Sequence, residues 1–138
     1  MATLGSLGEI TDRENGPPCH RTKGQIEAEV SKAIIRFDRE HYGRGPADVR
    51  TRIVQDMIIV RSTDVLTPTE HALVESGSVE LVKAVRSKLY ESHRAELNQT
   101  LRAITGCEII SMHRDLSTRT GERLIVFILK GDLEADLA

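Results

Sequence analysis

The sequence predicts a two-layer α+β domain in which a four-stranded antiparallel sheet packs on helices, in the order αββααββ. Two pairs of short segments rich in branched residues are each joined by a polar connection, which is typical of β-hairpins. Two further segments repeat apolar residues every three to four positions, which is typical of helices with one buried side, and a third begins with a capping box. The 138 residues, 39% of them hydrophobic, suffice for one compact domain and are too few for two.

We expect the folded domain to span residues 23–134. Residues 1–22 hold three glycines and two prolines with little apolar content, which is typical of a disordered tail. Cys19 and His20 at its end supply two ligands, too few to close a tetrahedral metal site, so we predict no metal and no cofactor. The acidic residues 135–138 are expected to fray.

The first predicted helix begins near Lys23. Its apolar stripe consists of Ile26, Val30, Ile34 and Phe37. Gly43 suits the left-handed position past a helix end, and the proline that follows three residues later prevents the helix from continuing.

Residues 49–54 and 57–63 predict the first hairpin. Val49, Thr51 and Ile53 alternate onto one face of the first strand, whose other face is largely polar. The second strand begins with four apolar residues in a row, which favours a central position in the sheet.

The strongest local signal is a helix start at Thr67. Thr67 can accept a hydrogen bond at the N-cap, Pro68 fits the first helical position, and Glu70 completes a capping box. We interpret the motif as structural.

A longer helix is predicted from Ser78 to Thr105. At 1.5 Å per residue its roughly 28 residues would span about 42 Å, so it either bends near His93 or overhangs the domain. An overhanging apolar stripe would need a second subunit to cover it. His93 stands where the stripe expects an apolar residue, and we expect it to be a partly buried histidine. The apolar stripe comprises Val79, Val82, Val85, Leu89, Leu97, Leu101 and Ile104.

Residues 107–112 and 124–129 predict the second hairpin, joined by the polar stretch 115–123. The second of these strands is apolar on both faces and is expected to be central. Cys107 is expected to be a small buried hydrophobe. Because one face of the four strands is left open, we expect a homodimer.

Several classes of protein are excluded by composition. A formal net charge of -2 and 3% aromatic residues argue against a nucleic-acid binder. The longest apolar run, residues 124–129, is far shorter than the roughly 20 residues of a membrane span, so no direct membrane insertion is expected. The first residues lack the pattern of a secretory signal, which favours the cytoplasm.

Two polar groups are candidate sites. His113 and Asp115 share one side of an extended strand, where a carboxylate can orient an imidazole, and Arg119 and Glu122 follow in the same connection. A solvated turn is the alternative interpretation, and we favour it. The second group, Arg44, Arg50 and Arg52, could contact an anion or an acidic partner.

The chain resembles the MpsC-like family, which is named for a component of a sodium-translocating, membrane-potential-generating system. The resemblance runs from about residue 23 to residue 134 and implies association with membrane-embedded transporter subunits, without catalytic residues to carry over. The matching segments are residues 23–27, 43–46, 66–70, 115, 118–123 and 126–127.

We therefore expect a soluble, non-catalytic accessory or regulatory protein of a cation-linked membrane-potential or inorganic-carbon uptake system. It would dock on the cytosolic faces of membrane subunits through the two polar groups. The alternative is a small-ligand sensor or enzyme whose pocket holds His113 and Asp115.

Overall fold

The computed structural model describes residues 21–137, and it confirms the predicted α+β class. The seven predicted elements occur in the predicted order and are followed by a short eighth one. The predicted tail, with Cys19, lies outside the described residues except for Arg21 and Thr22. The elements are α2 (Lys23–Tyr42), β2 (Asp48–Val54), β3 (Met57–Thr63), α3 (Pro68–Glu75), α4 (Val79–Thr105), β4 (Ile109–Ser117), β5 (Glu122–Leu129) and α5 (Leu133–Leu137).

The chain end differs from the sequence expectation of fraying from residue 135. Leu133 is fully buried in the core, and α5 extends from it to Leu137. The Gln55 N–H donates to a carboxylate oxygen of Glu134 at 2.8 Å, which ties α5 to the first hairpin turn. One buried leucine and this bond are enough to hold a helix that is too short to show a periodic pattern.

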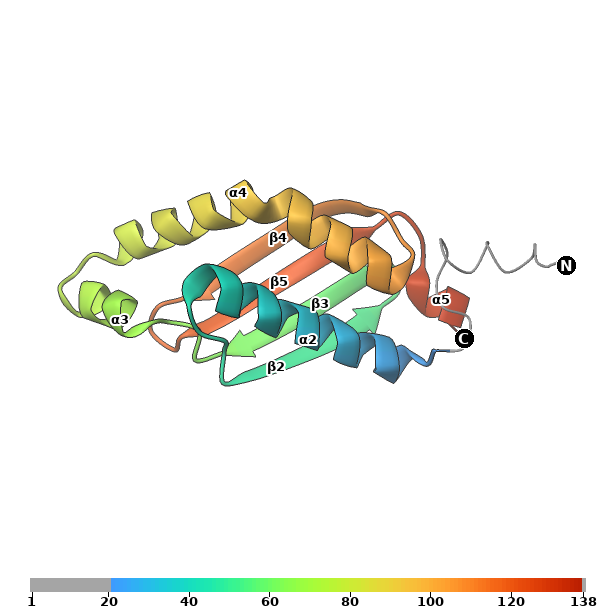
Figure 1. Ribbon diagram of the computed structural model, residues 1–138, viewed down its shortest axis with the longest axis horizontal. Coiled ribbons are helices and arrows are strands. Elements are labelled where there is room, and N and C mark those ends of the chain that lie inside the picture. Colours follow the sequence, from blue (N-terminus) through green and yellow to red (C-terminus); the bar gives the residue numbers. More distant parts are fainter. Residues whose placement is uncertain (1–20, 138) are drawn as a thin grey trace, which may run out of the picture.

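The sheet has the strand order β2-β3-β5-β4, and every neighbouring pair is antiparallel. The two predicted hairpins therefore meet along β3 and β5, and the prediction that these two strands are central is confirmed. Both α2 and α4 lie on the same side of the sheet (Figure 1). The strands point Ile58, Val60, Ile125 and Phe127 toward the helices, and all four are fully buried.

The helix ends follow the sequence signals. Thr22 and Gln25 form a capping box at the start of α2, and Gly43 ends the helix with a left-handed φ of 85°. The Thr67–Glu70 capping box of α3 is present as predicted.

Helix α4 is continuous over 27 residues, and its first turns extend past the end of the sheet above α3 (Figure 1). Its predicted apolar stripe is partly wrong. Val85 is 49% exposed. Arg86 and Tyr90, which directly follow the predicted stripe residues Val85 and Leu89, are buried instead. The buried side is therefore polar between Val82 and Leu97, where the helix passes over a cluster of charged residues.

Strand β4 is longer than predicted. The polar stretch from His113 was interpreted as a turn, but β4 continues to Ser117 and the turn comprises residues 118–121 only. Alternation along β4 places polar side chains toward solvent while Leu116 is buried, so the strand tolerates its polar composition.

Candidate functional site

The side of the sheet opposite α2 and α4 is exposed, and within residues 21–137 no helix covers it. The outward residues of its two central strands are mostly apolar, and Leu124 among them is 43% exposed. An apolar centre with a polar rim is the usual anatomy of a protein interface. We call this surface the outer sheet face; its residues are Arg50, Arg52, Val54, Met57, Ile59, Arg61, Ser111, His113, Asp115, Glu122, Leu124, Val126 and Ile128.

The strand register brings four of the predicted site residues onto the two margins of this face. One row across the sheet runs from Arg52 through the two central strands to His113. The next row runs from Arg50 to Asp115. The outer sheet face therefore has Arg50 and Arg52 on its β2 margin, where Arg50 pairs with Asp48 at 3.1 Å, and Asp115 and His113 on its β4 margin.

The remaining predicted residues have different surroundings. Arg44 donates to the Leu66 carbonyl at 2.8 Å and to the Asp64 carboxylate at 3.1 Å, so it fastens the link between β3 and α3. Glu122 pairs with Arg61 on the outer sheet face. Arg119 is exposed in the turn between β4 and β5.

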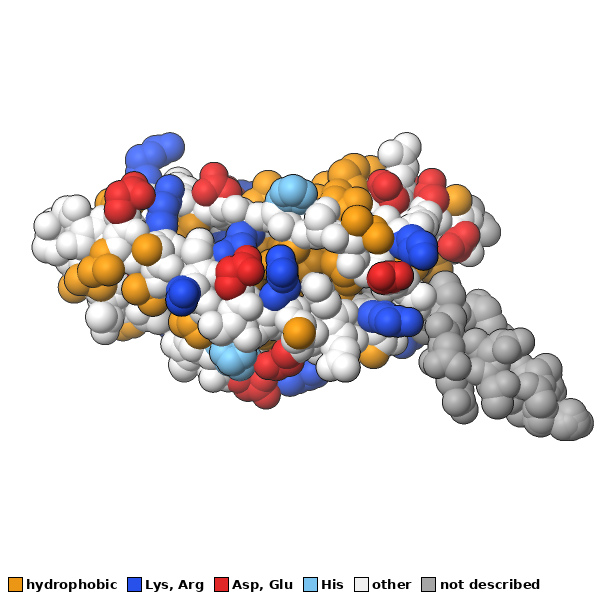
Figure 2. Space-filling view, turned by 90° about the horizontal axis from the view of Figure 1, so that it is seen from above, with side chains coloured by type: hydrophobic (Ala, Val, Ile, Leu, Met, Phe, Trp, Pro, Cys, Tyr) orange, Lys and Arg blue, Asp and Glu red, His pale blue; other side chains and the backbone are white. Residues whose placement is uncertain are grey.

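No single sign of charge dominates the face of the molecule seen from above (Figure 2). Figure 2 shows acidic and basic side chains interspersed with hydrophobic ones on the face seen from above. This agrees with the formal net charge of -2 and gives no extended basic footprint for a nucleic acid on that face.

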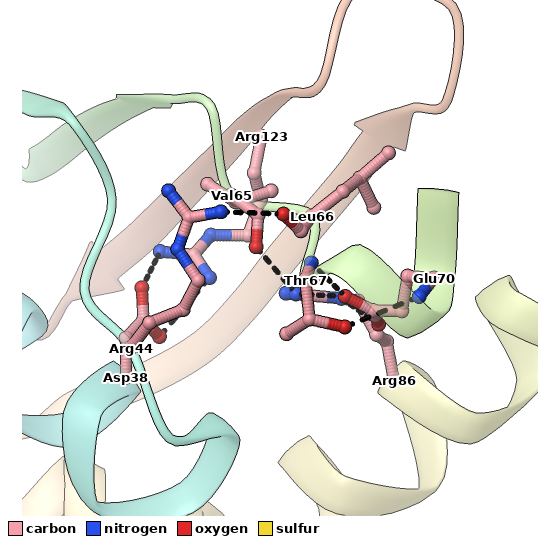
Figure 3. Close-up of polar contacts among 8 residues, drawn as sticks. All are labelled: Asp38, Arg44, Val65, Leu66, Thr67, Glu70, Arg86 and Arg123. Carbon is pink, nitrogen blue, oxygen red and sulfur yellow. Dashed lines mark hydrogen bonds and ion pairs between the residues drawn. The ribbon is translucent and has the colours of Figure 1, made fainter. Parts of the chain in front are cut away.

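Beneath the helices, Arg123 of β5 forms a bidentate ion pair with Asp38 of α2. Its two terminal nitrogens lie 3.1 and 2.8 Å from the carboxylate oxygens, and one also donates to Ser62 at 3.1 Å. Both side chains are at most 3% exposed. Figure 3 shows this pair and two further arginines gathered around the segment from β3 to α3. Each charge is buried with its counter-ion, as a buried charge requires.

A second pair joins α4 to α3. Arg86 donates to both carboxylate oxygens of Glu70 at 2.7 Å and to the Val65 carbonyl at 2.7 Å. Burial of the Glu70 carboxyl raises its pKa, but hydrogen bonds from Arg86 and Thr67 outweigh burial, so the pKa lies below its usual value. The capping box is thus also the anchor for a buried arginine (Figure 3).

Between α4 and the start of β5 lies a cavity of about 110 Å³, which we call the α4 cavity. Ser87 in its lining is exposed, so the cavity opens to solvent. Asp115 contributes to the lining of this cavity, whereas His113 does not. The charged and aromatic lining residues are Lys83, Arg86, Tyr90, Arg114, Asp115 and Arg123.

Two histidines and a glutamate meet between α2 and α4. The His41 and His93 rings stack with centroids 3.8 Å apart and planes inclined by 27°, and Glu96 lies 3.4 and 3.6 Å from their nitrogens. The expectation of a partly buried His93 is confirmed. A metal ion lies in the plane of each ligating imidazole about 2.0–2.1 Å from its nitrogen, so rings stacked in this way would have to separate to share one ion.

The buried ion pairs were missed by sequence reasoning. Asp38 lies outside the predicted apolar stripe of α2, and the predicted stripe of α4 contains Val85 and not Arg86. A usable signal was present, because Arg86 and Tyr90 follow Val82 at intervals of four residues. Arg123 likewise alternates with Ile125 and Phe127 along β5.

Comparison with known proteins supports the resemblance drawn from the sequence. Residues 22–131 match the family model described as "Na+-translocating membrane potential-generating system (MpsC)". The chain is 44% identical over 118 residues to the uncharacterized protein YbcI of Bacillus subtilis (strain 168), covering 85% of this chain and 95% of that protein. No solved structure matches the chain significantly. Within residues 21–137, no helix has the length and apolar character needed to cross a membrane.

A match over most of the folded chain, together with a relative of this identity and coverage, establishes the family. This chain belongs to the MpsC family, whose description is that of a Na+-translocating, membrane-potential-generating system.

Proposed function

We propose that this protein is a non-catalytic accessory component of a Na+-translocating, membrane-potential-generating system. It works as a homodimer, joined through the outer sheet face, that docks on the cytosolic side of membrane-embedded subunits. The family description supports the system. The outer sheet face carries the proposal of a binding protein, because an exposed apolar centre between charged margins is what a partner surface requires.

The occupant of the outer sheet face is a second copy of the chain. Its residues form rows across the sheet, with Arg50 at one end and Asp115 at the other end of the same row. If the second copy is rotated by half a turn about an axis parallel to the strands, β2 of each copy lies over β4 of the other. Arg50 then faces Asp115 of the second copy, Arg61 lies over Leu124, and Ile59 and Val126 of the neighbouring row meet their counterparts.

The other two-fold arrangement is unfavourable. Rotation about the in-plane axis perpendicular to the strands places β2 over β2, so that Arg50 and Arg52 face like charges. The charge pattern therefore selects one dimer, in which sheets pack face to face at the roughly 10 Å spacing usual for sandwiches.

A charge exchange tests the dimer. Arg50→Glu alone and Asp115→Arg alone each place like charges opposite one another, so each is expected to shift the protein toward monomer in sedimentation velocity. The double variant, Arg50→Glu with Asp115→Arg, restores opposite charges and should restore the dimer. Arg94→Glu changes an exposed α4 residue outside the face and serves as the matched control. A wild-type monomer at every concentration, or single variants that dimerise normally, would contradict the proposed dimer.

The accessory role is tested in cells that carry the family's Na+-translocating system. We expect deletion of the gene to reduce the Na+-dependent membrane potential reported by a voltage-sensitive dye. The wild-type chain and the double charge exchange should restore the potential, and Arg50→Glu alone should not. An unchanged potential in the deletion strain would overturn the accessory role whatever the oligomeric state.

A further inference from the structure

The α4 cavity gathers positive charge that its surroundings only partly neutralise. Four basic residues line it, together with one carboxylate, that of Asp115. Two of the four are neutralised by ion pairs, Arg123 with Asp38 and Arg86 with Glu70. Within residues 21–137, Lys83 and Arg114 form no ion pair, although Arg114 donates to the Ser87 carbonyl at 3.1 Å. The cavity therefore retains a net positive charge.

Three of the lining side chains also carry buried polar atoms that lack a hydrogen-bond partner among residues 21–137. These atoms are Nη1 of Arg86, Nε of Arg123 and the hydroxyl of Tyr90. The three residues are at most 4% exposed. Most buried polar groups in folded proteins are hydrogen-bonded, so it is unusual that three residues of one lining each keep an unused donor.

Tyr90 is the centre of the cluster. The guanidinium carbons of Arg114 and Arg123 lie 4.9 and 5.6 Å from its ring centroid, so both cations rest against the same ring. Burial raises the pKa of the Tyr90 hydroxyl above its usual value. The hydroxyl therefore stays protonated at neutral pH and is a hydrogen-bond donor.

We propose that the α4 cavity is a binding site for a small oxyanion, either a phosphate or sulfate group or a carboxylate. The cavity's 110 Å³ is several times the roughly 10–15 Å³ that admits one water, so it has room for an ion of this size. Guanidinium groups match the oxygen geometry of both ligand types. Most of the lining lies on the helix side of the sheet, and Asp115 is the residue that the cavity shares with the outer sheet face. The two proposals are tested by different substitutions, so either can fail without the other.

Tyrosine fluorescence provides the readout. The chain has no tryptophan and two tyrosines, so Tyr42→Phe leaves Tyr90 as the dominant emitter. This substitution keeps the ring over which Arg86 lies and removes a hydroxyl that has no partner among residues 21–137. The full-length Tyr42→Phe chain is titrated separately with potassium phosphate, sulfate and acetate, and with potassium chloride at the same ionic strength.

We expect a saturable change in Tyr90 emission with at least one oxyanion and none with chloride. The salt that produces the change shows whether the ligand is a tetrahedral anion, such as phosphate or sulfate, or a carboxylate. Lys83→Gln with Arg114→Gln should weaken the affinity at least about tenfold, since charge-assisted hydrogen bonds are lost. Lys88→Gln with Arg94→Gln, which removes two α4 charges outside the cavity, should leave the affinity unchanged.

Two results would overturn the site. One is an emission change that, for every oxyanion, rises linearly with concentration or equals the change with chloride. Such a change would be a general salt effect. The other is a saturable response that the Lys83 and Arg114 substitutions leave unchanged. If the double variant does not fold, as judged by circular dichroism, Lys83→Gln alone is used, because Lys83 is half-buried and its replacement disrupts no ion pair within residues 21–137.

Discussion

Arg123 donates two hydrogen bonds to the Asp38 carboxylate, and both side chains are nearly inaccessible to water. Removing one partner of such a pair leaves the other charge buried and uncompensated. We expect Asp38→Asn to lower the free energy of unfolding by roughly 3–5 kcal/mol, measured by urea denaturation.

The control for this measurement is Glu91→Gln, which removes one partner of an exposed pair with Arg94 on α4. Exposed pairs contribute about 0–1 kcal/mol, so its effect should stay within that range. If Asp38→Asn costs no more than this control, Arg123 is stabilised by something other than its counter-ion.

Glu70 makes stability depend on pH in the acid range. Its pKa is lowered in the folded chain, so its stabilising contribution is present above the unfolded value of 4.5 and is lost as pH falls through the folded value. We expect Glu70→Gln to be less stable than the wild type at neutral pH, with the difference narrowing in acid. The comparison uses urea midpoints across pH, with Glu91→Gln again as control. A difference that does not change with pH would contradict the assignment.

Single residues were the hardest features to predict. The burial of Asp38 could not be predicted, because an aspartate is almost never fully buried unless it is paired. Its partner Arg123 lies on β5, far away in the chain. His113 and Asp115 were correctly expected to share one side of a strand. That their side is the outer sheet face follows from the position of the helices, which no local pattern contains.

At the level of elements, α3 depends on its cap more than on packing. None of its residues is fully buried, and its first turn is held by the reciprocal bonds between Thr67 and Glu70. Thr67→Ala should therefore lower the free energy of unfolding by about 1 kcal/mol and speed amide hydrogen exchange at the start of α3. Thr69→Ala, at an exposed position in the same turn, should do neither. Equal exchange rates in the two variants would show that the cap is dispensable.

Elements were more predictable than residues because their signals are local. Caps, terminating glycines and period-two or period-3.6 patterns lie within a few residues of one another, and α2, α3 and both hairpins follow them. The predicted strand 107–112 ends earlier than β4 does, because the outward side of β4 is polar up to Ser117. α5 was missed because a single turn has no period to detect.

At the level of the whole molecule, the class and the central strands could be predicted, since two-sided apolar strands must lie between others. The register between the two hairpins could not be predicted. It decides that Arg52 and His113 end the same row and that Arg123 reaches Asp38. These are contacts between segments whose separation in the chain leaves no trace in composition or spacing.

The strand order also bears on how fast this chain acquires its native structure. Each half contributes a long helix followed by a hairpin, and the halves join only where β3 pairs with β5, through partners more than about sixty residues apart. Local hairpins close in microseconds, whereas distant pairings must first overcome the entropy of the intervening loop. We therefore expect the pairing of β3 with β5 to be the slow step of folding. Until it occurs, each half has an unpaired strand edge through which chains can aggregate.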